Sequence, residues 1–205
     1  MTIPTQEELV RCAQEFYPRG FPPEDDDARE PIPAHQRTPE HQRFIAAWER
    51  ALEWKEWSAF VEELPARFPD HAVGGGTQPF VSACLRSQIY KVEPQPDGNK
   101  LVTRWAIAVS VLAPLYIVYV ATQLWYPTRR ASRPTLSLDP QEGTRHPAEA
   151  LGHLAERVLN CRPFPLSLAH VPLPDLRIGQ INHLSAEPPP TLLDGFFMDD
   201  LANLP

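Results

Sequence analysis

The residues of this chain that could do chemistry are 7 histidines, 3 cysteines and a few tight groups of acids. A zinc site needs ligands that converge, usually His and Cys pairs at close spacing. His35 and His41 lie six residues apart across a proline boundary, and His146 and His153 lie seven apart on one predicted helix. Neither pair can hold an ion without a third element, so we expect surface histidines, no metal and no cofactor.

Motifs for nucleophilic catalysis and for phosphate binding are missing from the sequence. There is no GxSxG nucleophile elbow, and neither GxxxxGK[ST] nor GxGxxG occurs. The triple glycine at 74–76 is better explained as a turn, and Cys84 lies in an apolar stretch typical of a buried small hydrophobe. The sequence therefore predicts that the protein is not an enzyme. An enzyme with an unfamiliar motif is the alternative.

Acidic residues gather toward the two ends of the chain. Residues 1–70 hold 15 acids and 8 bases, residues 71–180 hold 7 and 11, and residues 181–205 hold 4 and none, for a net charge of −7. Phosphate binding needs a clustered basic face, so we do not expect nucleic acid as the ligand. An acidic surface suits a basic protein partner.

The tightest acidic groups are Glu24-Asp25-Asp26-Asp27 and Asp199-Asp200. They lie in polar segments, which lack the buried surroundings that separate the pKa values of a catalytic acid and base. We interpret them as solvated or partner-facing acids. The three cysteines stand far apart, with no CxxC pair and no secretory leader ahead of them, which predicts a reducing, cytoplasmic location.

The segment from Trp105 to Trp125 has no charged residue and is long enough to span a membrane as a helix. Three features favour buried β structure instead. β-branched and aromatic residues dominate the segment, Pro114 would interrupt a helix, and the strand-like stretch 80–93 precedes it with Asp97-Gly98 as hairpin turn chemistry. We therefore predict a central hairpin strand that bends or bulges at Pro114. A single membrane span at 105–125 is the alternative.

Amphipathic helices are predicted before and after this hairpin. Thr5 and Glu8 form an S/T-x-x-E capping box at the start of a helix over 5–17, and residues 146–160 form another helix. Between them, Thr38-Pro39 begins one long helix that ends at Leu64-Pro65. Its predicted buried stripe consists of Phe44, Ile45, Trp48, Leu52, Ala59 and Phe60.

Trp54 and Trp57 lie off the centre of that stripe, because each residue of a helix turns by about 100°. They either widen the core face or stay partly exposed. An exposed Trp among Glu53, Lys55 and Glu56 would be a good anchor for a protein interface.

These elements predict an α+β fold, in which an antiparallel sheet is built around the long central hairpin and amphipathic helices pack on one face. We expect one domain over residues 1–205, with a Pro-rich acidic loop at 18–39, since the chain has 25 prolines against 9 glycines. A loop is predicted at 127–140, an extended edge segment at 163–178, and a short apolar element at 191–201.

Four segments resemble, in their order and type, the immunity proteins of bacterial polymorphic toxin systems. They are CLRSQIY at 84–90, VSVLAPLYIVY at 109–119, LPDL at 173–176 and TLLDGFFMDDL at 191–201. The resemblance implies a cytoplasmic protein that binds and blocks a cognate toxin, such as a nuclease, and it carries over no functional residue.

On this hypothesis the binding site combines apolar anchors with acidic steering. Trp54 or Trp57 is the anchor that contacts the toxin. The acids that would draw a basic toxin toward it are Glu24, Asp25, Asp26, Asp27, Asp199 and Asp200. A membrane-associated protein is the remaining alternative.

Overall fold

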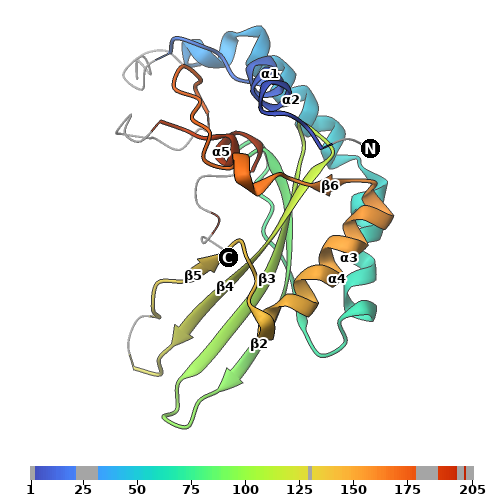
Figure 1. Ribbon diagram of the computed structural model, residues 1–205, viewed down its shortest axis with the longest axis vertical. Helices are drawn as coiled ribbons and strands as arrows, with labels where there is room; N and C mark the ends of the chain where they lie inside the picture. The colour runs from blue at the N-terminus through green and yellow to red at the C-terminus, as the bar shows by residue number, and fades with distance from the viewer. Residues whose placement is uncertain (1–2, 22–31, 129–130, 179–188, 198–200, 202–205) are drawn as a thin grey trace.

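A computed structural model describes residues 3–21, 32–128, 131–178, 189–197 and 201. The helices are α1 (Gln6–Phe16), α2 (Pro39–Leu52), α3 (Lys55–Arg67), α4 (Glu142–Leu159) and α5 (Leu192–Phe196), with short 3-10 turns η2 (Ala34–Arg37) and η3 (Leu166–Leu168). The strands are β1 (Ala72–Gly75), β2 (Cys84–Pro94), β3 (Lys100–Ser110), β4 (Leu115–Trp125), β5 (Thr135–Ser137) and β6 (Arg162–Pro163). Figure 1 shows helices packed around a twisted sheet, so the predicted α+β class is confirmed.

The sheet is an antiparallel meander in the order β1-β2-β3-β4-β5, and β6 pairs in parallel with the start of β4. β2 and β3 form the predicted hairpin, paired from Cys84 with Ser110 to Pro94 with Lys100. Its turn contains Gly98 at a φ of 82°, and the Gly98 N–H donates to the Gln95 carbonyl at 3.0 Å. The turn chemistry read from Asp97-Gly98 is therefore confirmed.

The uncharged segment 105–125 lies in strands, but in two strands rather than one. β3 and β4 are joined by the turn at 111–114, and they pair from Lys100 with Trp125 to Val109 with Tyr116. Pro114 lies in that turn, where its missing N–H costs no sheet hydrogen bond. Within the part of the chain that is described, no helix is both long and apolar enough to cross a membrane.

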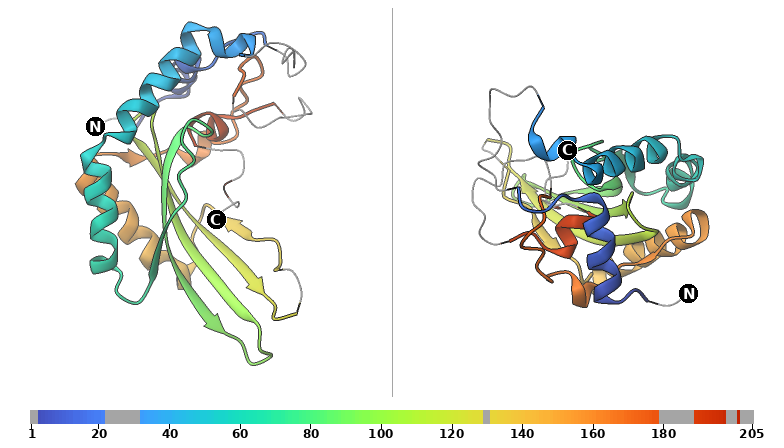
Figure 2. Two further views of the ribbon diagram at one scale, coloured as in Figure 1. Left: turned by 180° about the vertical axis from the view of Figure 1, so that it is seen from behind. Right: turned by 90° about the horizontal axis from the view of Figure 1, so that it is seen from above.

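The central strands are apolar on both sides, and each side is covered by helices. Ala106, Ala108, Ile117 and Tyr119 face one cluster, which also contains residues of α1, α2 and α5. Trp105, Ile107, Val109 and Val120 point the opposite way into a cluster with α3 and α4. Figure 2 shows α3 and α4 on one side of the sheet and α5 on the other. The expectation of helices on one face is corrected, because a sheet with two apolar faces needs cover on both.

The predicted long helix is divided into α2 and α3 between Leu52 and Lys55. α2 buries Phe44 and Trp48 in the cluster on one sheet face, whereas α3 buries Phe60 in the cluster on the other. A straight helix cannot contact both faces, so the chain bends where it passes the end of the sheet. As a result Leu52, which we had placed in the buried stripe, is 55% exposed. Ala59 is exposed as well.

The smaller elements differ from the sequence predictions mainly in their ends. The α1 capping box between Thr5 and Glu8 is present as predicted. α4 begins at Glu142 rather than 146, and the predicted loop at 127–140 contains the short strand β5. The triple glycine is largely strand β1 and not a turn. A side chain at Gly76 would place its Cβ 2.8 Å from Nε of the buried Arg86, so glycine is required there by close approach.

Candidate functional site

The bend between α2 and α3, which we call the elbow (residues 50–57), holds both tryptophans singled out from the sequence. Trp54 is the N-cap residue of α3, and Trp57 lies in its first turn. Both are half-buried, and both pack against the clusters on the two sheet faces. Both alternatives predicted for these residues therefore apply. Each Trp extends the buried core and is also partly exposed.

One groove of about 370 Å³ lies beside Trp54. Its walls are the end of α2 and the turn between β3 and β4, and it is lined by Ala47, Arg50, Ala51, Trp54, Ser110, Val111, Leu112, Ala113 and Pro114. Most of these side chains are apolar. The groove can therefore receive an apolar side chain of a partner against the face of the indole ring.

A second groove of about 440 Å³ lies beside Trp57. It runs between α3 and the end of β1, and it is lined by Trp57, Val61, Gly75, Gly76, Thr77, Gln78, Arg86 and Ser87. The Trp57 ring is stacked on Phe60 at 5.3 Å between ring centroids, which fixes its orientation. Each groove thus includes one elbow tryptophan, and the exposed Leu52 lies at the end of α2, two residues before Trp54.

Hydrogen bonding separates the two elbow tryptophans from the other three. The indole N–H groups of Trp48, Trp105 and Trp125 donate to Ser82 O, Thr144 O and Gln123 Oε1 at 2.8, 2.8 and 2.9 Å. Among the described residues, the indole N–H groups of Trp54 and Trp57 have no acceptor, and neither nitrogen is a buried unsatisfied atom. Neither donor is therefore completely buried.

The charged residues at the elbow and one position before it are exposed, and they include one more acid than base. Glu49, Glu53 and Glu56 stand among Arg50 and Lys55 around the apolar Leu52. A rim of this kind favours a basic partner over an acidic one. The other predicted steering residues, Glu24, Asp25, Asp26, Asp27, Asp199 and Asp200, lie outside the described residues, so they stay predictions.

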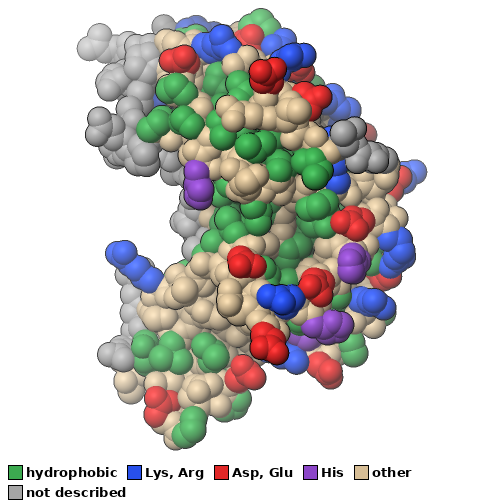
Figure 3. All heavy atoms as spheres, viewed as in Figure 1, with side chains coloured by type: hydrophobic (Ala, Val, Ile, Leu, Met, Phe, Trp, Pro, Cys, Tyr) green, Lys and Arg blue, Asp and Glu red, His purple; other side chains and the backbone are tan. Residues whose placement is uncertain are grey.

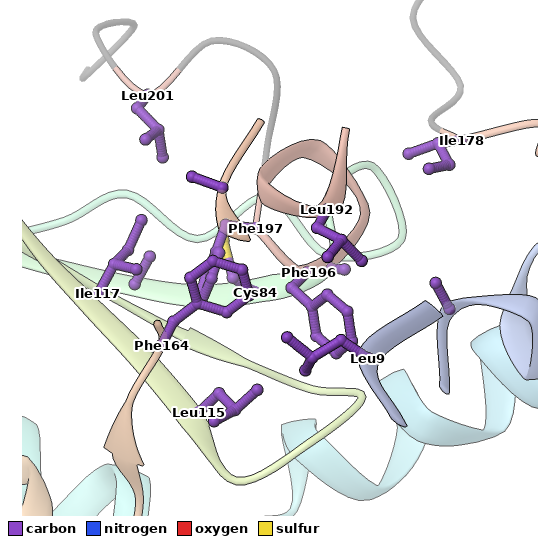
Figure 4. Close-up of a cluster of buried hydrophobic side chains, with 14 of the residues drawn as sticks. Leu9, Cys84, Leu115, Ile117, Phe164, Ile178, Leu192, Phe196, Phe197 and Leu201 are labelled. Atoms are coloured by element: carbon purple, nitrogen blue, oxygen red, sulfur yellow. The ribbon is translucent and has the colours of Figure 1, made fainter. Parts of the chain in front are cut away.

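The four segments that carry the resemblance meet in one buried cluster (Figure 4). They contribute Cys84 from β2, Leu115 and Ile117 from β4, Leu173 and Leu176 from the segment before α5, and Leu192, Phe196, Phe197 and Leu201 from the C-terminal segment. These side chains are 8% exposed or less. The buried members of these segments therefore determine packing of the scaffold, while other members, such as Val111 and Ser87, line the two elbow grooves.

A third concave site lies between α4 and β4, away from the elbow. This cavity of about 270 Å³ has apolar walls and the titratable groups Tyr116, Glu149, His153 and Glu156. The Tyr116 hydroxyl donates to Glu156 Oε1 at 2.9 Å. Figure 3 shows acids, histidines and Lys or Arg side chains interspersed over α4 beside apolar side chains. Sequence reasoning considered His153 but missed the glutamates, whose seven-residue spacing on one helix was the available signal.

Chemistry by a cysteine nucleophile is disfavoured by burial. Burial raises the pKa of Cys12, Cys84 and Cys161 to about 11, so the thiols stay protonated at neutral pH. Cys84 is 1% exposed, which confirms its interpretation as a buried small hydrophobe. No group of three or more His, Cys, Asp or Glu with the geometry of a metal site occurs in the described ranges.

Comparisons of the chain with protein-family models, curated proteins and solved structures found no match.

Proposed function

We propose that this protein is a non-catalytic, cytoplasmic immunity protein that binds and neutralises a basic cognate toxin, such as a nuclease, through the elbow. The observation that carries the proposal is the pair of indole N–H groups at Trp54 and Trp57, neither completely buried and both without an acceptor among the described residues, each Trp beside a groove. Tryptophan is strongly enriched at interface hot spots because it offers a large apolar face and one polar donor.

The two grooves define how the partner docks. Apolar side chains of the toxin enter the grooves beside Trp54 and Trp57, and the exposed Leu52 at the end of α2 makes a further apolar contact. Carbonyl or carboxylate oxygens of the toxin accept the two indole protons. Basic residues of the toxin meet Glu49, Glu53 and Glu56, and the net charge of −7 favours their approach.

Leu52 gives the sharpest test because it is exposed and its replacement leaves the core intact. We expect Leu52→Glu to weaken toxin binding by about tenfold or more, since about 1.4 kcal/mol of binding free energy corresponds to that factor. Val92→Glu is the matched control, because Val92 is 48% exposed at the far end of β2. Binding is measured by calorimetry with the product of the neighbouring gene, and circular dichroism checks that both variants are folded.

Two further outcomes decide the proposal. Co-expression with the neighbouring gene should rescue growth and give a stable complex. The double variant Trp54→Ala/Trp57→Ala should bind the toxin more weakly than Leu52→Glu does. Unchanged binding by a folded double variant would remove the elbow as the site, and failure of co-expression to rescue growth would remove the immunity function itself.

A further inference from the structure

The cavity between α4 and β4 carries two carboxylates without a cation. Glu149 and Glu156 line it and are seven residues apart, which is about two helical turns, so they lie on the same side of α4. In the described structure neither forms an ion pair. Arg157, the residue next to Glu156, is instead ion-paired with Glu63 of α3. Among the described lining residues there is no Lys or Arg, while His153 lines the cavity too and both carboxylates lie at its exposed rim.

One of these carboxylates is held in place by a buried donor. Tyr116 is 7% exposed, and its hydroxyl donates to Glu156 Oε1 at 2.9 Å. Burial, and then the neighbouring Glu156, raises the pKa of Tyr116, so the phenol keeps its proton and remains a donor. Glu156 is thereby oriented at the cavity before any ligand arrives, which lowers the cost of binding.

The backbone of α4 is adapted to this contact. A Cβ on Gly152 would lie 2.9 Å from the Tyr116 hydroxyl oxygen, which is closer than unbonded atoms approach. Glycine at 152 therefore lets the phenol of β4 pass beside the helix and reach Glu156 one turn further on. The hydrogen bond joins residues 40 positions apart in the sequence.

The walls of the cavity are apolar and its size is small. Val118, Pro163 and Phe164 line it together with the ring of Tyr116. Its volume of about 270 Å³ lies just below the range of pockets that hold drug-sized ligands, so it fits a group no larger than one long side chain. Aromatic rings and carboxylates together favour a cation with an apolar stem.

From this geometry we propose that the α4–β4 cavity binds an alkylammonium or alkylguanidinium group. The cationic head lies against the Glu156 carboxylate, Glu149 adds negative charge from two turns away on α4, and the stem lies against Pro163 and the aromatic rings. This proposal is independent of the elbow. The group comes either from a free small amine or from a Lys or Arg side chain of another protein, and both present the same chemistry.

Titration of the full chain, followed by amide NMR at low salt and about pH 8, where ordinary imidazole groups are neutral, tests the proposal. The probes are pentylamine, agmatine and, as an anion of similar size, pentanoate. We expect saturable shifts for both cations, with a dissociation constant on the order of 1 mM, and none for pentanoate. Glu149→Gln/Glu156→Gln should weaken agmatine binding by about fivefold or more, whereas the matched control Glu142→Gln/Glu62→Gln should not.

The source of the cation is distinguished by a second titration. A tripeptide amide with an acetylated Gly at its N-terminus and Arg at its centre should bind as tightly as agmatine if the cavity takes the side chain of a protein. Binding of agmatine without the peptide would assign the cavity to a free small amine. Absence of saturable binding by both cations, equal binding of pentanoate, or unchanged agmatine affinity in a folded Glu149→Gln/Glu156→Gln variant would overturn the proposal.

Discussion

His71 lies between α3 and β1, and both of its buried ring nitrogens lack a hydrogen-bond partner among the residues that the structure describes. Its ring is edge-on to Trp105 and Phe68, at 5.2 and 5.9 Å between ring centroids. Burial lowers the pKa of His71 below the ordinary 6.5, and Lys91 lowers it further while Asp70 opposes the change. The neutral ring is therefore the form that the folded protein accepts.

Acid should consequently weaken the fold through His71. Because its pKa is lower in the folded state, the unfolded state binds more protons as the pH falls below 6.5, and the free energy of unfolding falls with it. Above the ordinary pKa of 6.5, the stability that depends on a neutral His71 is fully present. We expect His71→Phe to lose less stability than the wild type between about pH 7.5 and about pH 5.5 in urea denaturation. Burial also lowers the pKa of His41, which is present in both proteins. Only the difference between the stability curves of the wild type and His71→Phe therefore reports on His71.

At Gly152, the effect of an alanine substitution on the free energy of unfolding should change sign with the residue at position 116. In the wild type, Gly152→Ala forces its Cβ against the Tyr116 hydroxyl, and overpacking of this kind costs about 1–3 kcal/mol of the free energy of unfolding. In a Tyr116→Phe background the hydroxyl is gone, so the higher helix propensity of alanine should make the same change stabilising, by up to about 1 kcal/mol. Urea denaturation of the four proteins gives the cycle.

The test compares the effect of Gly152→Ala on the free energy of unfolding in the wild type with its effect in Tyr116→Phe. Tyr116→Phe alone should cost about 1 kcal/mol, because it removes the hydrogen bond to Glu156. If Gly152→Ala has the same effect in both backgrounds, the hydroxyl is not what requires glycine at this position.

At the scale of elements, α1 is specified by its own sequence. Thr5 accepts from the Glu8 N–H at 3.3 Å, and Glu8 Oε2 accepts from the Thr5 N–H at 2.8 Å. We expect Thr5→Ala to lower the free energy of unfolding by about 1 kcal/mol, because the first turn loses its cap. Thr5→Ser keeps the hydroxyl and should stay close to the wild type in thermal and urea denaturation. Equal loss in both variants would mean that the methyl group, and not the cap, supports α1.

The features that could be predicted from the sequence are the local ones. The α1 capping box and the Asp97-Gly98 turn each depend on residues three or fewer positions apart, so a short window contains the whole cause. The break at Glu53–Trp54 has no glycine or proline to announce it. It follows from the position of the sheet, whose two faces must both be covered, and that position is set by strands later in the chain.

The candidate site likewise contains some residues that the sequence identifies and others that it does not. The elbow tryptophans were identified from an angle that assumed one continuous helix, whereas the break between α2 and α3 is what places them at the surface. Leu52 was misplaced because it is the last residue of α2, where the chain turns away from the sheet face that Phe44 and Trp48 cover. Tyr116 and Glu156 meet only because β4 and α4 pack together, and no pattern within either segment indicates that contact.

At the scale of the whole molecule, the central strands join two clusters of buried side chains. Phe196 of α5 lies in one and Phe60 of α3 in the other, and both are fully buried. Because β3 and β4 contribute to both clusters, we expect Phe196→Leu and Phe60→Leu each to lower the free energy of unfolding by about 1 kcal/mol in a single transition. Tryptophan fluorescence and far-ultraviolet circular dichroism should give the same midpoint. Separate midpoints would show that the two faces unfold independently.

The charge of the chain acts on association more than on the final contacts. With a net charge of −7, approach of a basic toxin should be accelerated at low ionic strength and slowed as salt screens the charges. We expect the association rate constant to fall by about tenfold or more between about 20 mM and about 500 mM salt, with little change in the dissociation rate constant.

Substitutions at the elbow should show the opposite kinetics. Leu52→Glu removes a desolvated apolar contact, so its main effect should be faster dissociation, which salt changes little. Surface plasmon resonance at several salt concentrations separates the two rates, with Val92→Glu as the control that carries the same added charge. A salt-independent association rate would show that the acids do not steer the toxin. Unchanged dissociation in Leu52→Glu, with association equal to or faster than that of the wild type, would place the elbow outside the contact surface, because an added acid remote from the contacts only assists the approach of a basic toxin.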